Sequence, residues 1–373
     1  MKKIKVMSVF GTRPEAIKMA PVVKALEADD AIESIVCVTA QHREMLDQVL
    51  ELFQIKPDYD LDIMQHGQTL SDITCRILKG LEGVIQEVKP DIVLVHGDTT
   101  TTLAASLAAF YNHTKVGHVE AGLRSLDLYS PFPEELNWSL TGRIANLHFS
   151  PTVSNVNNLI REGIDEKYIY QVGNTVIDAL IQVIKDEYTF EDASLNQIRY
   201  DERRVILLTA HRRENLGEPM RSIFSAVRRI VDDFEDVELI FPMHKNPKVR
   251  ELAQEYLGGT QRIHLIEPLE YEPFANLMAK ADIILTDSGG IQEEAPALGK
   301  PVLVLRKETE RPEAVEAGTV LLAGIEENTI YDMTAELLSD NRAYDKMANA
   351  VNPYGDGKTS KRIAEIIKSY FEK

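Results

Sequence analysis

Glycine and basic residues follow the first apolar run of the chain. Residues 11–15 read Gly-Thr-Arg-Pro-Glu, and Lys18 comes about one helical turn later. A glycine lets the backbone approach a phosphate, and a helix N-terminus favours negative charge. Arg13 and Lys18 add full positive charges. The segment is compatible with a phosphate site, but taken alone it is a weak signal, and an ordinary turn with a solvated arginine is the commoner explanation.

Three acidic residues stand at corresponding places further along the first half of the chain. Asp98 lies in His-Gly-Asp-Thr, Glu120 in His-Val-Glu-Ala-Gly, and Glu134 in Pro-Phe-Pro-Glu-Glu. Each one alone could serve a helix instead, because Asp98 is placed to cap the next helix and Glu134 could complement a helix dipole. Three acids on neighbouring strand ends favour a ligand site, because doubly wound folds bind ligands at that edge.

A second phosphate motif stands in the other half of the chain, at residues 286–295 (Thr-Asp-Ser-Gly-Gly-Ile-Gln-Glu-Glu-Ala). Ser288, Gly289 and Gly290 offer a hydroxyl and unobstructed backbone N–H groups to a phosphate. Glu294, about one turn into the predicted helix, could accept both hydroxyls of a ribose. The segment lacks Gly-x-Gly-x-x-Gly and the Gly-Lys-Ser/Thr ending of a P-loop, which disfavours NAD binding and ATP hydrolysis.

Two further residues in this half could face the same ligand. His211 follows a predicted strand in Thr-Ala-His-Arg-Arg-Glu-Asn, and Arg311 begins Arg-Pro-Glu-Ala. A buried, hydrogen-bonded histidine is the alternative for His211. Its position at a strand end among charged residues favours a ligand contact.

Short apolar runs alternate with helical patterns along almost the whole chain. Strands are predicted first at residues 4–10, 34–39, 91–95, 115–119 and 147–150. Helices follow them, for example at 13–28, 43–53, 99–111 and 132–146. A second series of strands is predicted at 205–209, 238–242, 263–266, 283–286 and 301–305. This alternation favours right-handed βαβ units and parallel sheets covered on both faces.

The length of 373 residues and the restart of the pattern predict two domains. We expect an N-terminal Rossmann-like domain at 1–170 and a C-terminal one at 171–358. The amphipathic segment 359–373 follows a run of breakers and is expected to pack back onto the first domain. Two doubly wound domains facing a central cleft would hold a ligand where their strand ends meet.

Composition limits the class of protein. Hydrophobic residues make up 44% and charged residues 27%, as in a globular protein, and the formal net charge is −18. This charge disfavours a general affinity for nucleic acid or for anionic membranes. We see no signal peptide and no apolar run near the roughly 18 residues of a membrane span. Cys37 and Cys75 have no metal-ligand spacing, so both are expected to be reduced, core or near-core residues of a cytoplasmic protein.

Taken together, the motifs resemble those of the non-hydrolysing UDP-N-acetylglucosamine 2-epimerases. Seven motifs match in order over essentially the whole chain, at residues 11–16, 96–99, 119–124, 132–135, 211–215, 287–290 and 311–313. The resemblance implies a GT-B-type α/β architecture and reversible conversion of UDP-N-acetylglucosamine to UDP-N-acetylmannosamine. It also implies a homodimer, with no cofactor, neither nicotinamide nor metal. In Gram-positive members of the family the product feeds cell-wall or capsule polymers.

The same resemblance implies a role for individual residues. The residues similar to the UDP-binding set are Arg13, Lys18, Ser288, Gly289, Gly290, Glu294 and Arg311. Those similar to the catalytic set are Asp98, Glu120, Glu134 and His211. Part of a regulatory site for a second UDP-N-acetylglucosamine, which would make the enzyme allosteric, is matched by Gln41, His42, Arg43 and His244. Gly67 stands where some members carry a basic side chain, which counts against that site.

Epimerisation at carbon 2 places specific demands on such a site. No carbonyl acidifies the hydrogen on that carbon, so loss of UDP from carbon 1 would have to make it acidic, giving a glycal to which UDP adds back. Cations and N–H groups would stabilise the departing diphosphate, and carboxylates would stabilise the ring and move the proton. A GT-B glycosyltransferase, a hydrolysing epimerase and a nucleotide-sugar sensor remain the competing hypotheses.

Overall fold

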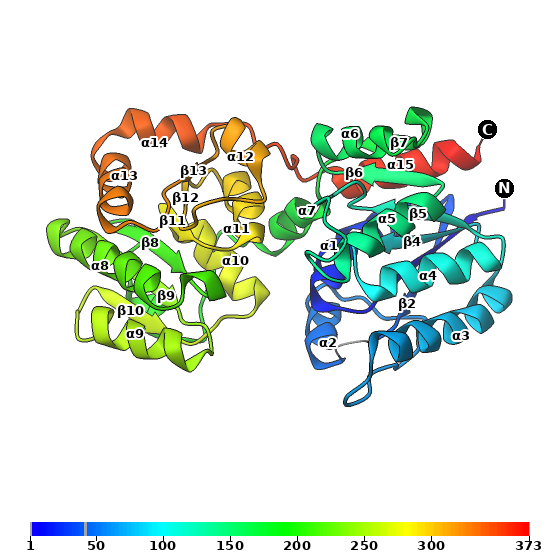
Figure 1. The fold of residues 1–373 in the computed structure, drawn as a ribbon, viewed down its shortest axis with the longest axis horizontal. Helices are drawn as coiled ribbons and strands as arrows, with labels where there is room; N and C mark the ends of the chain where they lie inside the picture. Colours follow the sequence, from blue (N-terminus) through cyan, green and yellow to red (C-terminus); the bar gives the residue numbers. More distant parts are fainter. Residues whose placement is uncertain (1, 41–42, 373) are drawn as a thin grey trace. The chain divides into compact units, whose positions relative to one another are not determined.

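The computed structural model describes residues 2–40 and 43–372, and this part of the chain forms two compact units (Figure 1). The first unit extends to Gln182 and also contains the C-terminal segment from Tyr354, and the second is Val183–Pro353. The chain thus leaves the first unit after Gln182 rather than near residue 170. The reason is that α7 (Thr175–Val183) stays attached to the first unit through Asp178, which accepts a hydrogen bond from the backbone N–H of Ser360.

The first unit is built on one parallel sheet. Its strands are β1 (Ile4–Phe10), β2 (Ile32–Val38), β3 (Tyr59–Asp60), β4 (Ile92–His96), β5 (Lys115–Val119), β6 (Leu147–Ser150) and β7 (Ile169–Gln171). Their order is β3-β2-β1-β4-β5-β6-β7, and every pair is parallel. All five residues of β4 are buried, as expected for a strand covered on both faces. The central strands β1, β4 and β5 therefore end side by side at one edge of the sheet.

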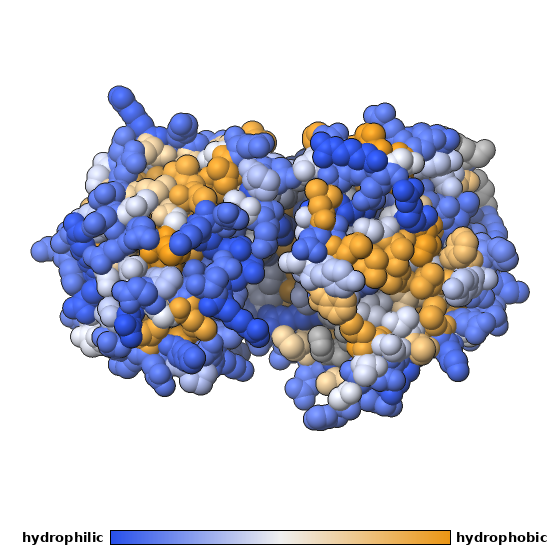
Figure 2. Space-filling model, viewed as in Figure 1, coloured by the Kyte–Doolittle hydropathy of each residue, from blue (hydrophilic) through white to orange (hydrophobic). Residues whose placement is uncertain are grey.

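Helices cover both faces of this sheet. They are α1 (Arg13–Glu27), α2 (Arg43–Leu52), α3 (Leu70–Val88), α4 (Thr100–Tyr111), α5 (Glu134–Ile144), α6 (Val153–Arg161), α7 and α15 (Thr359–Phe371), with a short 3₁₀ turn, η1 (Glu166–Tyr168). Helices α3, α4 and α5 pack in a row, and α1 packs against both α2 and α15. Large apolar side chains of α4 and α5 remain exposed, among them Phe110, Tyr111, Leu136 and Leu140. Figure 2 shows apolar surface in this region.

The second unit repeats the architecture. Its strands are β8 (Arg204–Thr209), β9 (Val237–Pro242), β10 (Ile263–Ile266), β11 (Ile283–Thr286), β12 (Val302–Val304) and β13 (Val320–Leu322), in the order β10-β9-β8-β11-β12-β13. Its helices are α8 (Glu218–Asp233), α9 (Pro247–Leu257), α10 (Tyr271–Lys280), α11 (Gly289–Glu294), α12 (Pro312–Glu316), α13 (Glu327–Ser339) and α14 (Asn341–Ala348), with 3₁₀ turns η2 (Leu195–Gln197), η3 (Arg213–Asn215) and η4 (Ala295–Leu298). Both units are thus doubly wound, and the predicted fold class is confirmed.

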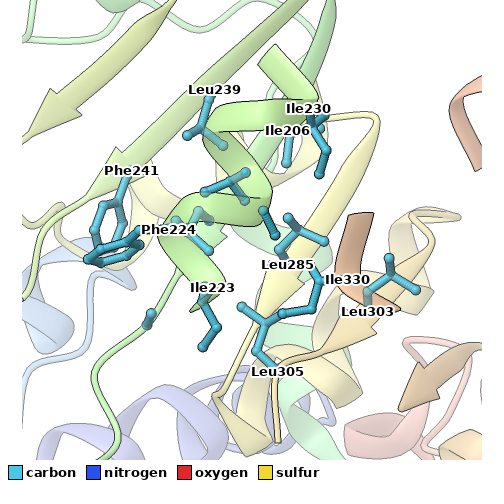
Figure 3. Close-up of a cluster of buried hydrophobic side chains, with 14 of the residues drawn as sticks. Ile206, Ile223, Phe224, Ile230, Leu239, Phe241, Leu285, Leu303, Leu305 and Ile330 are labelled. Atoms are coloured by element: carbon cyan, nitrogen blue, oxygen red, sulfur yellow. The ribbon is translucent and has the colours of Figure 1, made fainter. Parts of the chain in front are cut away.

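Apolar side chains of α8 hold the sheet of the second unit. Ile223, Phe224 and Ile230 pack against strand side chains that include Leu239 and Phe241 (Figure 3). The rings of Phe224 and Phe241 lie 5.5 Å apart between centroids and are tilted by 57°. The helix thus covers one face of this sheet with apolar side chains.

The C-terminal helix α15 begins on a buried carboxylate of α7. Asp178 accepts hydrogen bonds from the backbone N–H groups of Thr359 (3.2 Å) and Ser360 (2.8 Å) and from the Ser360 hydroxyl (2.5 Å). These N–H groups are at the start of a helix, where they have no partner within it. At the other end, Lys368 pairs with Asp29 at 3.0 Å. The helix therefore belongs to the first unit although it follows the second in sequence.

The two cysteines differ in their environment. Cys37 is buried in β2, and burial raises the pKa of its thiol to about 12. Cys75 is exposed, so its expected core or near-core position is wrong. The buried stripe of α3 consists of Ile73, Ile77, Leu81 and Ile85, and Cys75 lies off this stripe. None of the described helices is both long enough and apolar enough to cross a membrane.

Candidate functional site

The side chain of Glu120 is the centre of the polar cluster at the strand ends of the first unit. The residue comes directly after β5 and is 7% exposed. Its Oε1 lies 2.5 Å from the ammonium of Lys18 and accepts a hydrogen bond of 2.9 Å from the Asn174 amide. Its Oε2 lies 3.2 Å from Nε2 of His96. The carboxylate is thus surrounded by groups from three separate parts of the sequence.

The backbone at this point adopts a conformation that few side chains accept. Glu120 has φ +62°, in the left-handed region, and such a residue costs of order 1–3 kcal/mol unless its surroundings hold it. Gly122, two residues on, has φ +94°, and a Cβ there would lie 2.3 Å from the carbonyl oxygen of Asn155. The strained Glu120 is therefore held between a buried strand and a glycine that no other residue can replace without a clash.

Burial shifts the pKa values of two groups near Glu120 in opposite directions. Burial lowers the pKa of His96 to about 4, against the opposing charge of Glu120, so the imidazole is neutral at pH 7. For Asp98, burial raises the pKa to about 7; Glu120 and Glu134 reinforce this and Lys18 opposes it. Asp98 can therefore both bind and release a proton near neutrality, as a general acid or base must.

The structure decides between the two roles that the sequence left open for Asp98. Helix α4 is capped by Thr99, whose hydroxyl accepts from the N–H of Thr102 at 3.2 Å. The capping role for Asp98 is therefore wrong, and Asp98 instead receives a hydrogen bond from Asn137 on its backbone carbonyl. Its carboxylate is not used by the helix.

Glu134 and Glu135 open α5 but differ in their partners. Glu135 is buried and accepts from the backbone N–H groups of Ser125 (2.7 Å) and Leu126 (3.3 Å), so it fixes the preceding loop. Glu134 is half-buried and lies close enough to Asp98 to affect its ionisation. The structure therefore brings Lys18, Asp98, Glu120 and Glu134 into one region of the first unit.

Glu15 also belongs to this polar cluster, although the sequence analysis did not assign it a role. It is 2% exposed and accepts from the N–H groups of Gly11 (3.0 Å) and Thr12 (2.8 Å) and from the Thr99 hydroxyl (2.6 Å). Burial raises the pKa of Glu15, and these hydrogen bonds oppose the rise. The Thr-x-x-Glu capping box at residues 12–15 was the signal that could have revealed it. Glu15 ties the turn that carries Arg13 to the turn that carries Asp98.

In the second unit, Asp287 organises the strand ends. Its Oδ2 accepts from the N–H groups of His211 and Arg212, both at 2.8 Å, and from the Asn215 amide at 3.1 Å. Its Oδ1 lies 3.0 Å from Nδ1 of His211. Burial favours the protonated form, but the contacts with His211 and Arg212 hold the pKa of Asp287 below its usual value. An ionised partner at Nδ1 orients the His211 ring and leaves its other nitrogen for a ligand.

Cationic side chains converge on the Ser-Gly-Gly turn. A Cβ added to Gly289 would lie 3.9 Å from guanidinium atoms of both Arg212 and Arg311, so the turn has a positive edge. The guanidinium of Arg311 pairs with the buried carboxylate of Glu293. Arg212 was not among the residues predicted from the sequence, because one of two adjacent arginines cannot be selected without the backbone.

Two other predicted residues of this unit have clear neighbours. The Glu294 carboxylate accepts a 3.1 Å hydrogen bond from the Tyr271 hydroxyl, and Ser288 is the N-cap residue of α11. The ring of His244, predicted for a regulatory site, stacks on His211 with centroids 5.6 Å apart. His244 therefore stands beside a residue predicted to be catalytic.

Of the other residues predicted for regulation, the structure describes Arg43 alone. Gln41 and His42 lie outside the described residues. The guanidinium of Arg43, in the first unit, pairs with Asp60 (2.6 Å) and Asp62 (2.8 Å). The regulatory site stays a prediction. Within residues 2–40 and 43–372, no group of three or more His, Cys, Asp or Glu side chains is placed to hold a metal ion.

Comparisons with known proteins give similarity over the whole chain. The family model described as UDP-N-acetylglucosamine 2-epimerase matches residues 24–368. The UDP-N-acetylglucosamine 2-epimerase of Bacillus subtilis (strain 168) is 59% identical over 371 residues, covering 100% of this chain and 97% of that protein.

Solved structures agree with this result. A crystal structure of a UDP-N-acetylglucosamine 2-epimerase has a TM-score of 0.93 and 56% identity, covering 100% of this chain and 98% of that one. The UDP-GlcNAc 2-epimerase from Neisseria meningitidis, bound to UDP-GlcNAc, has a TM-score of 0.85 and 52% identity, covering 98% of this chain and 100% of that one. The similarity confirms the GT-B-type α/β class.

The raised pKa of Asp98 predicts a pH-dependent effect of Asp98→Asn on stability. In the unfolded chain the carboxyl group ionises near pH 3.8, whereas in the folded protein it keeps its proton up to about pH 7. Ionisation therefore costs folded stability progressively between these two values, and the cost is complete above the higher one. Asp98→Asn removes this cost of ionisation. Between about pH 5 and about pH 8, the free energy of unfolding of the ligand-free variant should therefore rise by about 2–4 kcal/mol relative to that of wild type.

Urea unfolding at the two pH values would measure this gain. Asp30→Asn, at an exposed position of the same unit, is the matched control and should show no comparable gain. A stability difference between wild type and Asp98→Asn that stays constant between the two pH values would contradict the burial of an ionisable Asp98.

Proposed function

Because this chain belongs to the UDP-N-acetylglucosamine 2-epimerase family, as its motifs predicted, we propose that it converts UDP-N-acetylglucosamine reversibly to UDP-N-acetylmannosamine without hydrolysis. The observation that carries the proposal is the pair Asp98 and Glu120 at the ends of adjacent strands. One carboxyl group titrates near neutrality, and the other is paired with Lys18. A binding protein would not need such a pair.

The proposed reaction proceeds by elimination and addition. The bond between carbon 1 and the β-phosphate oxygen breaks, and its electron pair leaves with UDP. A carboxylate removes the proton from carbon 2, and the electrons of that bond form the double bond of the glycal. Return of a proton to the opposite face of carbon 2, and attack of UDP on carbon 1, give the epimer. No oxidant, reductant or metal takes part in this balance.

Different residues serve the sugar, the diphosphate and the rest of UDP in this proposal. Asp98, Glu120 and Glu134 act on the sugar ring and its proton, with Asp98 able to exchange a proton in either direction. His211 contacts the diphosphate, with its ring held by Asp287. The groups that bind UDP are Arg13, Lys18, Ser288, Gly289, Gly290, Glu294 and Arg311. The positive edge at Gly289 supports this assignment for the leaving diphosphate.

The remaining expectations belong to the same proposal. The product supplies cell-wall or capsule polysaccharide synthesis, and the enzyme works in the cytoplasm. A homodimer stays a prediction, and the exposed apolar side chains of α4 and α5, among them Phe110 and Leu140, form a surface on which a second copy could pack.

Proton NMR of UDP-N-acetylglucosamine incubated with the enzyme in deuterated water tests the activity. We expect a second UDP-sugar to appear, with deuterium at carbon 2 of both epimers, because the abstracted proton exchanges with solvent before a proton returns. No sugar acceptor is added, so a glycosyltransferase or a sensor would leave the substrate intact. A hydrolase would release free sugar and UDP. Epimerisation with the original hydrogen retained at carbon 2 would contradict a freely exchanging acid–base pair.

Substitutions of the acids should separate catalysis from binding. Asp98→Asn, Glu120→Gln and Glu134→Gln should each lower turnover by roughly two to four orders of magnitude, the scale of a positioned acid or base, with UDP affinity near that of wild type. His211→Ala should also weaken UDP binding, because the ring contacts the diphosphate. Turnover by NMR and UDP titration by calorimetry would measure both effects.

Glu82→Gln, on the exposed side of α3, is the control for the loss of a carboxylate in the same unit. It should leave both turnover and UDP affinity unchanged. Near-normal turnover in Asp98→Asn would remove Asp98 from the catalytic set, and the other two acids would have to supply the proton transfers.

A further inference from the structure

Asn174 lies in the turn between β7 and α7, 54 residues after Glu120, and is 2% exposed. Both ends of its side-chain amide are used. The Nδ2 group donates to Glu120 Oε1 at 2.9 Å, and Oδ1 accepts from the N–H of Val176 at 3.0 Å. Because Oδ1 receives a backbone donor at the start of α7, the orientation of the amide is fixed, and Nδ2 must face Glu120.

The backbone of Asn174 holds the segment by which the chain returns to the first unit. Its N–H donates to the carbonyl of Tyr354 at 2.6 Å. The preceding residue, Gly173, has φ +101°, and a Cβ there would lie 2.7 Å from the hydroxyl of Thr359. Asn174 thus contacts the returning segment, which begins at Tyr354, through its backbone, and it contacts Glu120 through its side chain.

Charged and titratable groups from several elements surround Glu120, and they determine how the Asn174 amide affects its ionisation. Lys18 from α1 and His96 from β4 contact the carboxylate, and Asp98, after β4, interacts with it electrostatically. Glu134 and Glu15 act on Asp98 from the starts of α5 and α1. Among these groups Lys18 is a cation, His96 is neutral, and Asp98, Glu134 and Glu15 are carboxyl groups. A neutral donor such as the Asn174 amide favours an ionised Glu120 without adding charge.

We propose that Asn174 is a positioning residue for the reaction: its amide holds the Glu120 carboxylate in place and ionised, and its backbone fixes this contact to the returning chain segment. The inference rests on the proposed function, because the role of Glu120 in the sugar chemistry is assigned there. The side chain of Asn174 acts through Glu120 and need not touch the substrate.

Asn174→Asp tests the proposal, because it keeps the acceptor for the N–H of Val176 and removes the donor to Glu120. Aspartate accepts the N–H of Val176 as well as asparagine does, so the start of α7 keeps its cap. The donor to Glu120 is replaced by a second carboxyl group, and two neighbouring carboxyl groups hold a proton to higher pH. We expect kcat to fall roughly 10–100-fold near neutral pH, the acid limb of the kcat profile to move up by about one pH unit, and the Kd of UDP to stay within about twofold.

Two further variants supply the controls. Asn276 is also buried, donates to the carbonyls of Val183 and Glu272, and accepts from the N–H of Lys185, so Asn276→Asp makes the same chemical change in the second unit. It should leave the acid limb in place even if it lowers stability. In a Glu120→Gln background, Asn174→Asp should change the residual turnover less than threefold or so, because the partner on which it acts is already altered.

The outcomes separate this inference from the proposed function. A wild-type enzyme that epimerises, together with a folded Asn174→Asp enzyme of unchanged kcat profile, would overturn the positioning role alone. The same profile change in Asn276→Asp would also overturn it, because the effect would then be one of general stability. A wild-type enzyme that does not epimerise would overturn both the function and the role of Asn174.

Discussion

The side chain of Glu120 is buried at the end of a central strand, and a buried carboxylate is costly unless it is paired and hydrogen-bonded. Its partners come from three places: Lys18 from α1, His96 from β4 and Asn174 from the turn before α7. These side chains meet because β1, β4 and β5 are neighbours in a parallel sheet whose strands all end at one edge. The surrounding structure holds Glu120 in its left-handed backbone conformation.

Burial dominates the ionisation of Asp98 in the first unit, whereas hydrogen bonds dominate that of Asp287 in the second. Near the strand ends of the first unit, burial keeps His96 neutral and brings the ionisation of Asp98 close to neutral pH, so this unit contains groups that can exchange protons. In the second unit, hydrogen bonds from His211 and Arg212 outweigh the burial of Asp287 and keep it ionised. That carboxylate orients the His211 ring beside the arginines at the Ser-Gly-Gly turn. Proton transfer and anion binding thus depend on separate networks.

Apolar runs in the sequence predicted the fold class and most of the strands. Strands β1, β5, β6, β10 and β11 have the bounds expected from their apolar runs. Strand β3 was not predicted because its two residues, Tyr59 and Asp60, form no run, and Cys75 was misplaced because the face of α3 that packs inward is set by its neighbours. Asp98 and Glu120 were found from their strand ends. Asn174 could not be found, because its contact with Glu120 spans 54 residues and depends on the return of the chain.

The central claim is that these groups break the bond between carbon 1 and UDP and form it again during epimerisation. UDP-N-acetylglucosamine labelled with heavy oxygen in the bridge between carbon 1 and the β-phosphorus tests it directly. Once the bond breaks, rotation of the terminal phosphate makes its oxygens equivalent, so we expect label in non-bridging positions of both the product and the recovered substrate. Phosphorus NMR distinguishes these positions. Epimerisation with the label retained wholly in the bridge would contradict the account.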